Sequence, residues 1–149
     1  MPWAKPALCA AAGLMAVGVT ACAAPTPLGS SRPTEAATRT ANVERGQELY
    51  AATCQRCHGD ESGAGGIPEA PPHNADGHTW HHPDAQLIDW MLNGKPFTAM
   101  PGFGEELTRG DAEAVMAYIT AWWTEDQRAE QASVSERYRD ALDAQSEPP

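Results

Sequence analysis

The chain has 149 residues, a formal net charge of −10 at pH 7 and 7% aromatic residues. This length gives room for one small domain. Cationic residues are few and scattered, which excludes nucleic acid as an expected partner and argues against an electrostatic hold on anionic lipids. The negative charge either favours a partner with a basic docking surface or simply keeps the protein soluble.

Residues 1–22 have the composition of a signal peptide for export. Their apolar run is too short and too weakly hydrophobic to predict a membrane span. The segment 19–22 (VTAC) resembles the bacterial lipoprotein box, in which small residues precede a lipidated cysteine, here Cys22. The alternative is an ordinary signal peptide cut near Ala21 or Ala24. We therefore expect an exported protein on the periplasmic side of a bacterial membrane, lipid-anchored through Cys22 or soluble in the periplasm.

Residues 23–41 are rich in Ala, Pro, Ser and Thr. Such a composition cannot bury a core and predicts a disordered linker. A segment of this length reaches at most about 60 Å when extended, at roughly 3.1 Å per residue. With a lipid on Cys22, it would tether the folded part near the membrane.

The segment Cys54-Gln55-Arg56-Cys57-His58 is the attachment signature of c-type haem. Each thiol forms a thioether with one vinyl group of the porphyrin, and the next residue, His58, points an imidazole at the iron. A zinc site of the usual kind needs a second cysteine pair, and no other CxxC is present. A thioredoxin-like motif needs a βαβ pattern, which the sequence does not show.

The residues around this motif have helical periodicity. We expect a first helix from Asn42, because Asn42 can cap it and apolar or small residues recur at steps of three and four as far as Cys57. Residues 59–74 are rich in Gly and Pro and predict a loop. Residues 84–93 predict a second helix, which starts after Pro83 and stops at Gly94. Its inward stripe consists of Leu87, Ile88 and Met91.

Residues 95–104 predict a loop that contains Met100, and two further helices follow it. Thr108 and Asp111 form a capping-box-like start for the third helix. A last helix follows Thr124, with Gln127 three residues further on. Its thin apolar stripe predicts partial docking and consists of Val134, Tyr138, Ala141 and Leu142. No strand signal competes, so the expected fold class is all-α.

Residues 42–124 resemble class I cytochrome c. The shared features are the Cys–His motif, a loop with proline, a Met-Pro loop at 100–101, and a small residue and aromatic residues at helical positions, namely Gly46, Tyr50 and Tyr118. The resemblance implies a cytochrome c-like domain of three to five helices around one covalently bound haem, in which the first and last helices cross at Gly46 and the aromatic pair packs at that crossing. Residues 125–149 would form a C-terminal helical extension. His73 departs from the family, which has Leu at this place.

The resemblance also implies the ligands of the iron. His58 is the expected proximal ligand, and Met100, followed by Pro101, is the expected axial ligand on the other face. A thioether is a soft ligand that favours Fe(II) and raises the reduction potential. Met91, Met116 and a histidine are alternatives, but the two methionines lie on apolar helical stripes and are more simply core residues.

Two further residues are expected to contact the haem and its ligand. A metal-bound histidine usually donates its free N–H to an acceptor, and the resemblance implies a proline carbonyl, of Pro71 first and Pro72 second. Trp80 either donates its indole N–H to a haem propionate or packs in the ordinary way.

Four histidines, His73, His78, His81 and His82, fall within ten residues around Trp80. One interpretation is a second metal site for copper or zinc. The other is a polar loop over the haem edge, with one or two histidines bonded to propionates.

The sequence therefore predicts a single-electron carrier, a monohaem c-type cytochrome of a bacterial extracytoplasmic electron-transfer chain, and not an enzyme. We expect a monomer whose partners are other redox proteins. The alternatives are a periplasmic metal-binding module that uses the histidine cluster, and a haem-based sensor or enzyme with an open iron site.

Overall fold

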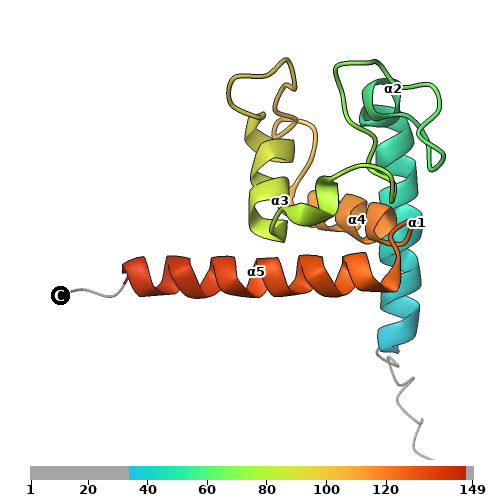
Figure 1. Cartoon of the computed structure of the whole chain (residues 1–149). Helices are drawn as coiled ribbons and strands as arrows, with labels where there is room; N and C mark the ends of the chain where they lie inside the picture. Colours follow the sequence, from blue (N-terminus) through green and yellow to red (C-terminus); the bar gives the residue numbers. More distant parts are fainter. Residues whose placement is uncertain (1–33, 147–149) are drawn as a thin grey trace, which may run out of the picture. The chain divides into compact units, whose positions relative to one another are not determined.

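The computed structural model describes residues 34–146, which contain five α-helices and one short 3₁₀-helix joined by loops (Figure 1). The helices are α1 (Glu35–Thr53), α2 (Gln55–His58), η1 (Thr79–His81), α3 (Asp84–Asn93), α4 (Arg109–Thr120) and α5 (Glu125–Ser146). These residues contain no strand, and the predicted all-α class is confirmed. The predicted signal peptide, Cys22 and the linker as far as residue 33 lie outside the described residues.

Helix α1 begins at Glu35, so the prediction of a helix start at Asn42 was wrong. Consequently, residues 35–41 of the predicted linker are helical. The Thr34 side chain accepts a hydrogen bond from the Ala37 amide, and Glu35 lies in the first turn, where its charge complements the helix dipole. The added turns are exposed. Capping and the high helix propensity of alanine therefore extend α1 where no core burial requires it.

Helices α1 and α4 cross at Gly46. A Cβ atom built on Gly46 would lie 2.0 Å from the Ala114 carbonyl oxygen, so only glycine permits this approach. One turn further along α1, Tyr50 packs edge-on against Tyr118 of α4, with ring centroids 5.7 Å apart. The crossing and the aromatic contact that the cytochrome c resemblance implied are both confirmed.

A capping box starts α4. Thr108 accepts a hydrogen bond from the Asp111 amide, and the Asp111 carboxylate accepts from the Thr108 amide and hydroxyl. Arg45 of α1 donates to the same carboxylate at 3.1 Å. The hydrogen bonds from Thr108, and then the one from Arg45, lower the pKa of Asp111. The ionised Asp111 carboxylate therefore stabilises the fold at neutral pH, and this stabilisation is lost as the pH falls through its lowered pKa.

We expect Thr108→Ala to lower the free energy of unfolding by about 1 kcal/mol, since α4 loses its cap at the helix that crosses α1. Denaturant unfolding followed by far-UV circular dichroism measures this change. Thr34→Ala is the matched control, because it removes the cap of the exposed start of α1 and should fray only those turns. Equal losses in both variants would contradict the assignment.

Helix α3 has the predicted bounds. Pro83 precedes it, and it ends at Gly94, whose φ of 86° suits glycine. Its buried residues are Leu87, Ile88 and Met91, as predicted. They join a core with α1 and α4 whose other buried members are Tyr50, Cys54, Ala112, Val115, Met116, Ile119 and Trp123.

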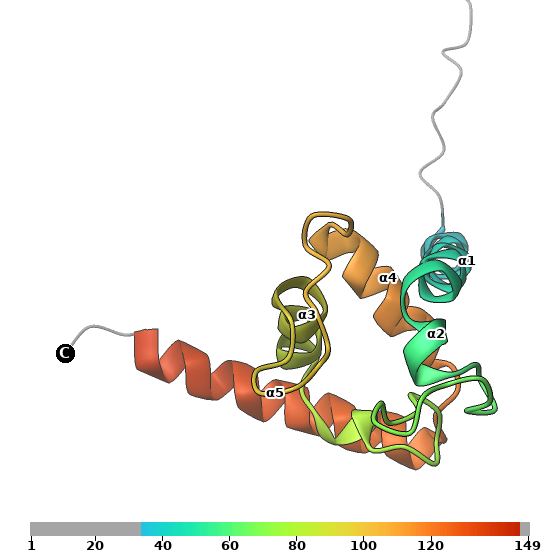
Figure 2. The same cartoon turned by 90° about the horizontal axis from the view of Figure 1, so that it is seen from above.

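Helix α5 lies along one side of the other elements, and its C-terminal end extends past α3 (Figure 2). The predicted cap is present, because Thr124 and Gln127 exchange hydrogen bonds between side chain and backbone. The predicted apolar stripe docks only in part, as expected, because Val134 and Tyr138 are half-buried whereas Ala141 and Leu142 are exposed. The fully buried residues of α5 are the polar Gln131 and Ser135, which were not predicted. Polar contacts, described below, hold this helix in place.

Candidate haem site

The two cysteines and the histidine lie in one turn at the end of α1. Cys54 follows α1 directly, and its amide donates to the Tyr50 carbonyl. The amides of Cys57 and His58 both donate to the Cys54 carbonyl, which forms the short helix α2. Beyond it, the Tyr50 hydroxyl donates to the Gly59 carbonyl at 2.9 Å. Tyr50, a buried residue of α1, thus holds both ends of the motif through its carbonyl and its hydroxyl.

The imidazole of His58 is oriented by a backbone acceptor. Its Nδ1 lies 2.8 Å from the carbonyl oxygen of Pro71, which is the contact that the resemblance implied. Because a carbonyl only accepts, Nδ1 carries the proton and Nε2 has a free lone pair. Burial lowers the pKa of His58, although the bond to Pro71 opposes this effect. The neutral form is the one that binds metals.

Cys54 and Cys57 are free thiols in the structure. Cys54 is buried, and burial, followed by the neighbouring Cys57, raises the pKa of its thiol to about 12. Its thiol is therefore protonated at neutral pH, unlike the exposed, low-pKa cysteines of redox motifs.

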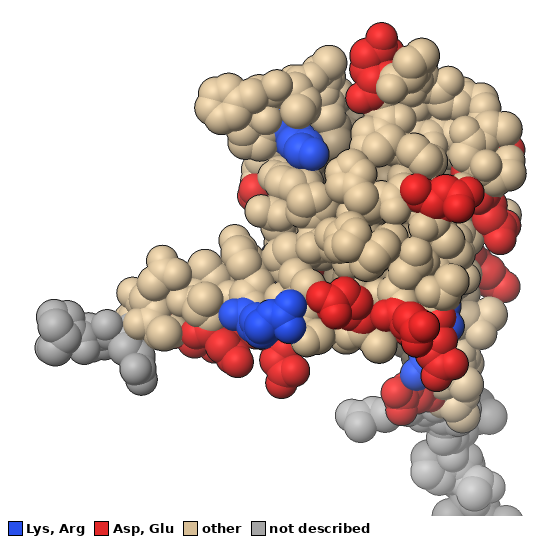
Figure 3. All heavy atoms as spheres, in the orientation of Figure 1, with Lys and Arg blue, Asp and Glu red and all other residues tan. Residues whose placement is uncertain are grey.

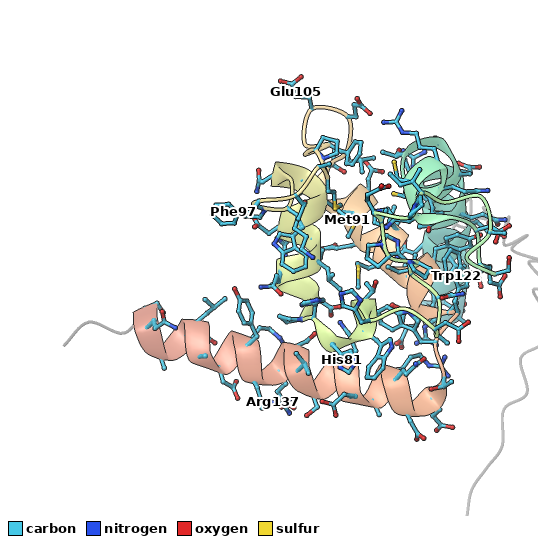
Figure 4. All side chains as sticks on the ribbon, turned by 45° about the horizontal axis from the view of Figure 1, so that its top comes forward. His81, Met91, Phe97, Glu105, Trp122 and Arg137 are labelled. Carbon is cyan, nitrogen blue, oxygen red and sulfur yellow. The ribbon has the colours of Figure 1, made fainter. Side chains whose placement is uncertain are left out.

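A mostly apolar cavity lies beside these residues, and Cys54, Cys57, His58, Pro71 and Met100 all line it. Its walls also contain core residues of α3 and α4 and of the loop before α4, namely Leu87, Met91, Leu107, Val115, Met116 and Ile119. Figure 4 shows Met91 in the interior between α3 and α4, whereas Phe97 points away from the body of the molecule. The thiols and imidazole of one wall thus share a cavity with the thioether of Met100.

The loop that carries Met100 is tied to the end of α3. The amides of Phe103 and Gly104 donate to the carbonyls of Met91 and Leu92, each at 2.9 Å. A Cβ atom on Gly102 would lie 2.7 Å from the Leu92 carbonyl oxygen, so the loop lies directly on the helix end. These contacts hold Met100 at the cavity wall.

His73 is packed against the predicted proximal ligand. Its ring stacks on that of His58 with centroids 3.9 Å apart and planes 21° apart. Burial, with His58 and His78 nearby, lowers the pKa of His73 to about 3, so the ring is neutral at pH 7. A flat imidazole thus lies where the cytochrome c resemblance places Leu.

Of the two roles expected for Trp80, the structure favours ordinary packing. Its indole N–H donates to the Gly77 carbonyl at 3.0 Å, and its ring stacks on His81. The tryptophan that lines the cavity is Trp90 of α3, three residues after Leu87 on the same helical face. That spacing was readable in the sequence. The charged residues of the cavity lining are Arg56, Glu69 and Lys95, and no sequence pattern marks them as site residues.

The four clustered histidines do not form one metal site, although His73, His78 and His82 line the same cavity as His58. His73 stacks on His58, His81 stacks on Trp80, and His78 and His82 face each other with ring centroids 5.7 Å apart. No group of three or more His, Cys, Asp or Glu side chains within residues 34–146 could hold a metal ion. The copper or zinc alternative therefore finds no ligand set in this part of the chain.

The residues of the cavity fit a haem. One wall carries the two free thiols and the neutral imidazole of His58, which the Pro71 carbonyl orients. Another wall carries the thioether of Met100, and the remaining lining is mostly apolar. Fold and site together are those of a small all-α domain of the cytochrome c class.

Comparison with known proteins identifies the family. The family described as cytochrome c oxidase, cbb3-type, subunit III matches residues 41–119, more than half of the chain, and the chain belongs to it. The chain is also 33% identical over 93 residues to dihydro-heme d1 dehydrogenase of Pseudomonas aeruginosa. The match covers 58% of this chain and 18% of that enzyme, so the chain spans less than a fifth of its relative. No solved structure matches.

The protein is thus a c-type cytochrome, and its family implies haem c and haem-based electron transfer with redox partners. Cytochrome c domains are typically extracytoplasmic. Within residues 34–146, no helix combines the length and the apolar character that a bilayer crossing requires.

Proposed function

We propose that this protein is a monohaem carrier of single electrons. One haem would be attached covalently to Cys54 and Cys57, with His58 and Met100 as the two axial ligands. The observation that carries the proposal is that all four side chains line one cavity, in which Nδ1 of His58 is already bonded to the Pro71 carbonyl.

When bound, the haem iron supplies a centre that cycles between Fe(III) and Fe(II). The protein's own residues set the potential of that cycle. Pro71 holds the His58 ring and raises its basicity, Met100 contributes a soft thioether that favours Fe(II), and the apolar walls exclude water. With both axial positions filled by the chain, no position would remain for a substrate.

We propose that the protein works outside the cytoplasm as part of an electron-transfer chain. The apolar segment 1–22 supports export, and the lipobox-like end supports lipidation of Cys22. Mass spectrometry of the mature N-terminus would detect the lipid on Cys22, and an unmodified first residue would contradict the anchor.

We propose that the redox partners present a basic docking surface and that the protein is a monomer. The net charge of −10 supports the first point. On the face that Figure 3 shows, acidic side chains gather along α5 and along the edge formed by α1. Opposite charges steer such encounters and make the association rate fall as salt is added.

The similarity to the protein named dihydro-heme d1 dehydrogenase supports an electron-transfer role for this chain. It does not imply that this chain has the dehydrogenase activity of that enzyme. The similarity reaches only 18% of that enzyme, so this chain matches a minor part of it. We propose that the present chain exchanges electrons with separate redox proteins and does not itself carry out a dehydrogenation.

Met100→Ala tests the axial ligand. We expect this variant to lose the sulfur-to-iron charge-transfer band of the oxidised protein, to bind carbon monoxide, and to have a lower reduction potential. The fall should be on the order of 0.1 V, a part of the roughly 0.8 V range that axial ligands span. Absorbance spectra during a redox titration measure all three.

Met116→Leu is the matched control, because Met116 is a buried methionine that lines the same cavity and the substitution conserves volume. It should keep the band. A band that survives in Met100→Ala and disappears in Met116→Leu would contradict the assignment of Met100. A native protein that lacks the band and binds carbon monoxide at neutral pH would favour the sensor or enzyme alternative.

A further inference from the structure

Alternate carbonyls of the loop that carries Pro71 are bound by side chains. From residue 71 to residue 77, every second carbonyl accepts one hydrogen bond from a side-chain N–H. The pairs are Pro71 with His58 at 2.8 Å, His73 with Trp123 at 2.8 Å, Ala75 with Gln127 at 2.8 Å and Gly77 with Trp80 at 3.0 Å. The loop is therefore fixed by donors from outside its own backbone.

Two of the four donors come from the junction of α4 and α5. Trp123 is buried and Gln127 is half-buried in the first turn of α5. Both follow the segment 41–119 that the family match covers. This C-terminal addition thus contacts the same loop whose Pro71 carbonyl orients the predicted iron ligand.

The middle of α5 has a second attachment, at the start of α3. The Ser135 hydroxyl accepts from the Asp84 amide at 2.9 Å, and the Gln131 side chain donates to the Asp84 carboxylate. Helix α3 carries Leu87, Trp90 and Met91 into the cavity wall and leads into the Met100 loop. Hence α5 connects the loop on the His58 side of the cavity with the helix on the Met100 side.

These contacts are polar and specific. The buried residues of α5 itself are Gln131 and Ser135, each 5% exposed. A helix that docked only to bury apolar surface could slide along its contact face, whereas hydrogen bonds to particular backbone atoms fix its register. This pattern is typical of an element that positions its neighbours.

We propose that Trp123 and α5 together form a brace, a segment that holds the haem site in position. Within it, Trp123 and Gln127 are positioning residues that act on His58 through the loop from Pro71 to Gly77. The inference rests on the proposed function, since it concerns the ligand of a haem iron. By holding the loop, the brace keeps the Pro71 carbonyl against Nδ1 of His58. It thereby raises the basicity of the ligand and lowers the reduction potential.

The test compares two variants of the full-length, haem-loaded protein. Trp123→Phe combined with Gln127→Glu removes both N–H donors, yet keeps an aromatic ring in the core and a side-chain acceptor for the Thr124 amide. Thr124→Ala is the matched control, because it weakens the cap of α5 and leaves both donors intact. The readouts are the exchange rate of the His58 Nδ1 proton, measured by NMR in the reduced protein, and the reduction potential.

We expect the Nδ1 proton to exchange at least about tenfold faster in the double variant, since two hydrogen bonds that restrain the loop are lost. The reduction potential should rise, while the control and the slowest amides of α1 stay near native values. Unchanged exchange and an unchanged potential in the double variant would overturn the proposal. If that variant does not fold, Gln127→Glu alone decides, with an expected increase in exchange of about fivefold. A native protein without covalent haem would instead refute the proposed function.

Discussion

A protein with Cys54→Ser and Cys57→Ser is expected to give up all of its haem to acidic acetone, whereas the native protein keeps its pigment. Both thiols are free and line the same cavity as His58, so the covalent bonds of the proposed site depend on them alone. Each single variant should keep one thioether bond to the haem, and its yield of coloured protein should be lower than that of the native protein. Absorbance of the extracted pigment, with mass spectrometry of the intact chain, measures the bound fraction.

The loss should also destabilise the fold. Aromatic residues make up only 7% of the chain, and the cavity walls come from α3 and α4, which would face an emptied space. Small domains commonly depend on a bound group to complete a sufficient core. Cys22→Ser is the control, because it removes the third cysteine that we assign a role, at the proposed lipid site, and should leave the haem covalently bound. Acid-stable pigment in the double variant would contradict the attachment.

The elements that the sequence predicted best are those with local signals. Helix α3 begins and ends where Pro83 and Gly94 predict, and the capping box of Thr108 and Asp111 marks the start of α4. These signals act through backbone geometry and hydrogen bonds within four residues. They therefore do not depend on how the rest of the chain folds.

The sequence was less informative where helices lack an apolar face. Residues 35–41 are exposed, so the start of α1 has no hydrophobic periodicity to reveal it, and only the cap at Thr34 marks it. Partial docking of α5 was predicted, but the residues that make its buried contacts were not, because they are polar. Its buried contacts are made by Gln131 and Ser135, residues that in a sequence read as part of a solvated face.

The same distinction applies to the candidate site. The Cys–His motif and Met100 follow from short patterns, and the structure brings these residues to one cavity. Which tryptophan lines that cavity depends on long-range contacts. The loop before α3 turns the Trp80 indole toward the Gly77 carbonyl, whereas the position of Trp90 on α3 carries it to the cavity wall. The hydrogen bonds from α5 to the Ala75 carbonyl and to the start of α3 join residues about fifty positions apart, so no short sequence pattern predicts them.

Replacing Gly46 with alanine is expected to lower the free energy of unfolding by about 2 kcal/mol. The new Cβ would lie 2.0 Å from the Ala114 carbonyl oxygen, 2.6 Å from its carbon and 2.9 Å from the Tyr118 Cβ. Most of these atoms are backbone, so no side chain can move aside and α1 must separate from α4. The overpacking outweighs the gain of about 1 kcal/mol that alanine brings to a helix.

The separation should reach the haem site, because α1 ends in the Cys–His motif while Val115 and Met116 of α4 line the cavity. Denaturant unfolding of the haem-loaded protein, followed by circular dichroism and haem absorbance, measures the change. Gly110→Ala is the matched control, since a Cβ there would meet only the Thr108 hydroxyl at 3.8 Å, and it should be neutral or stabilising by up to about 1 kcal/mol. If Gly46→Ala were as stable as Gly110→Ala, the close crossing of α1 and α4 would be wrong, and with it the packing that places Cys54 and His58 at the cavity.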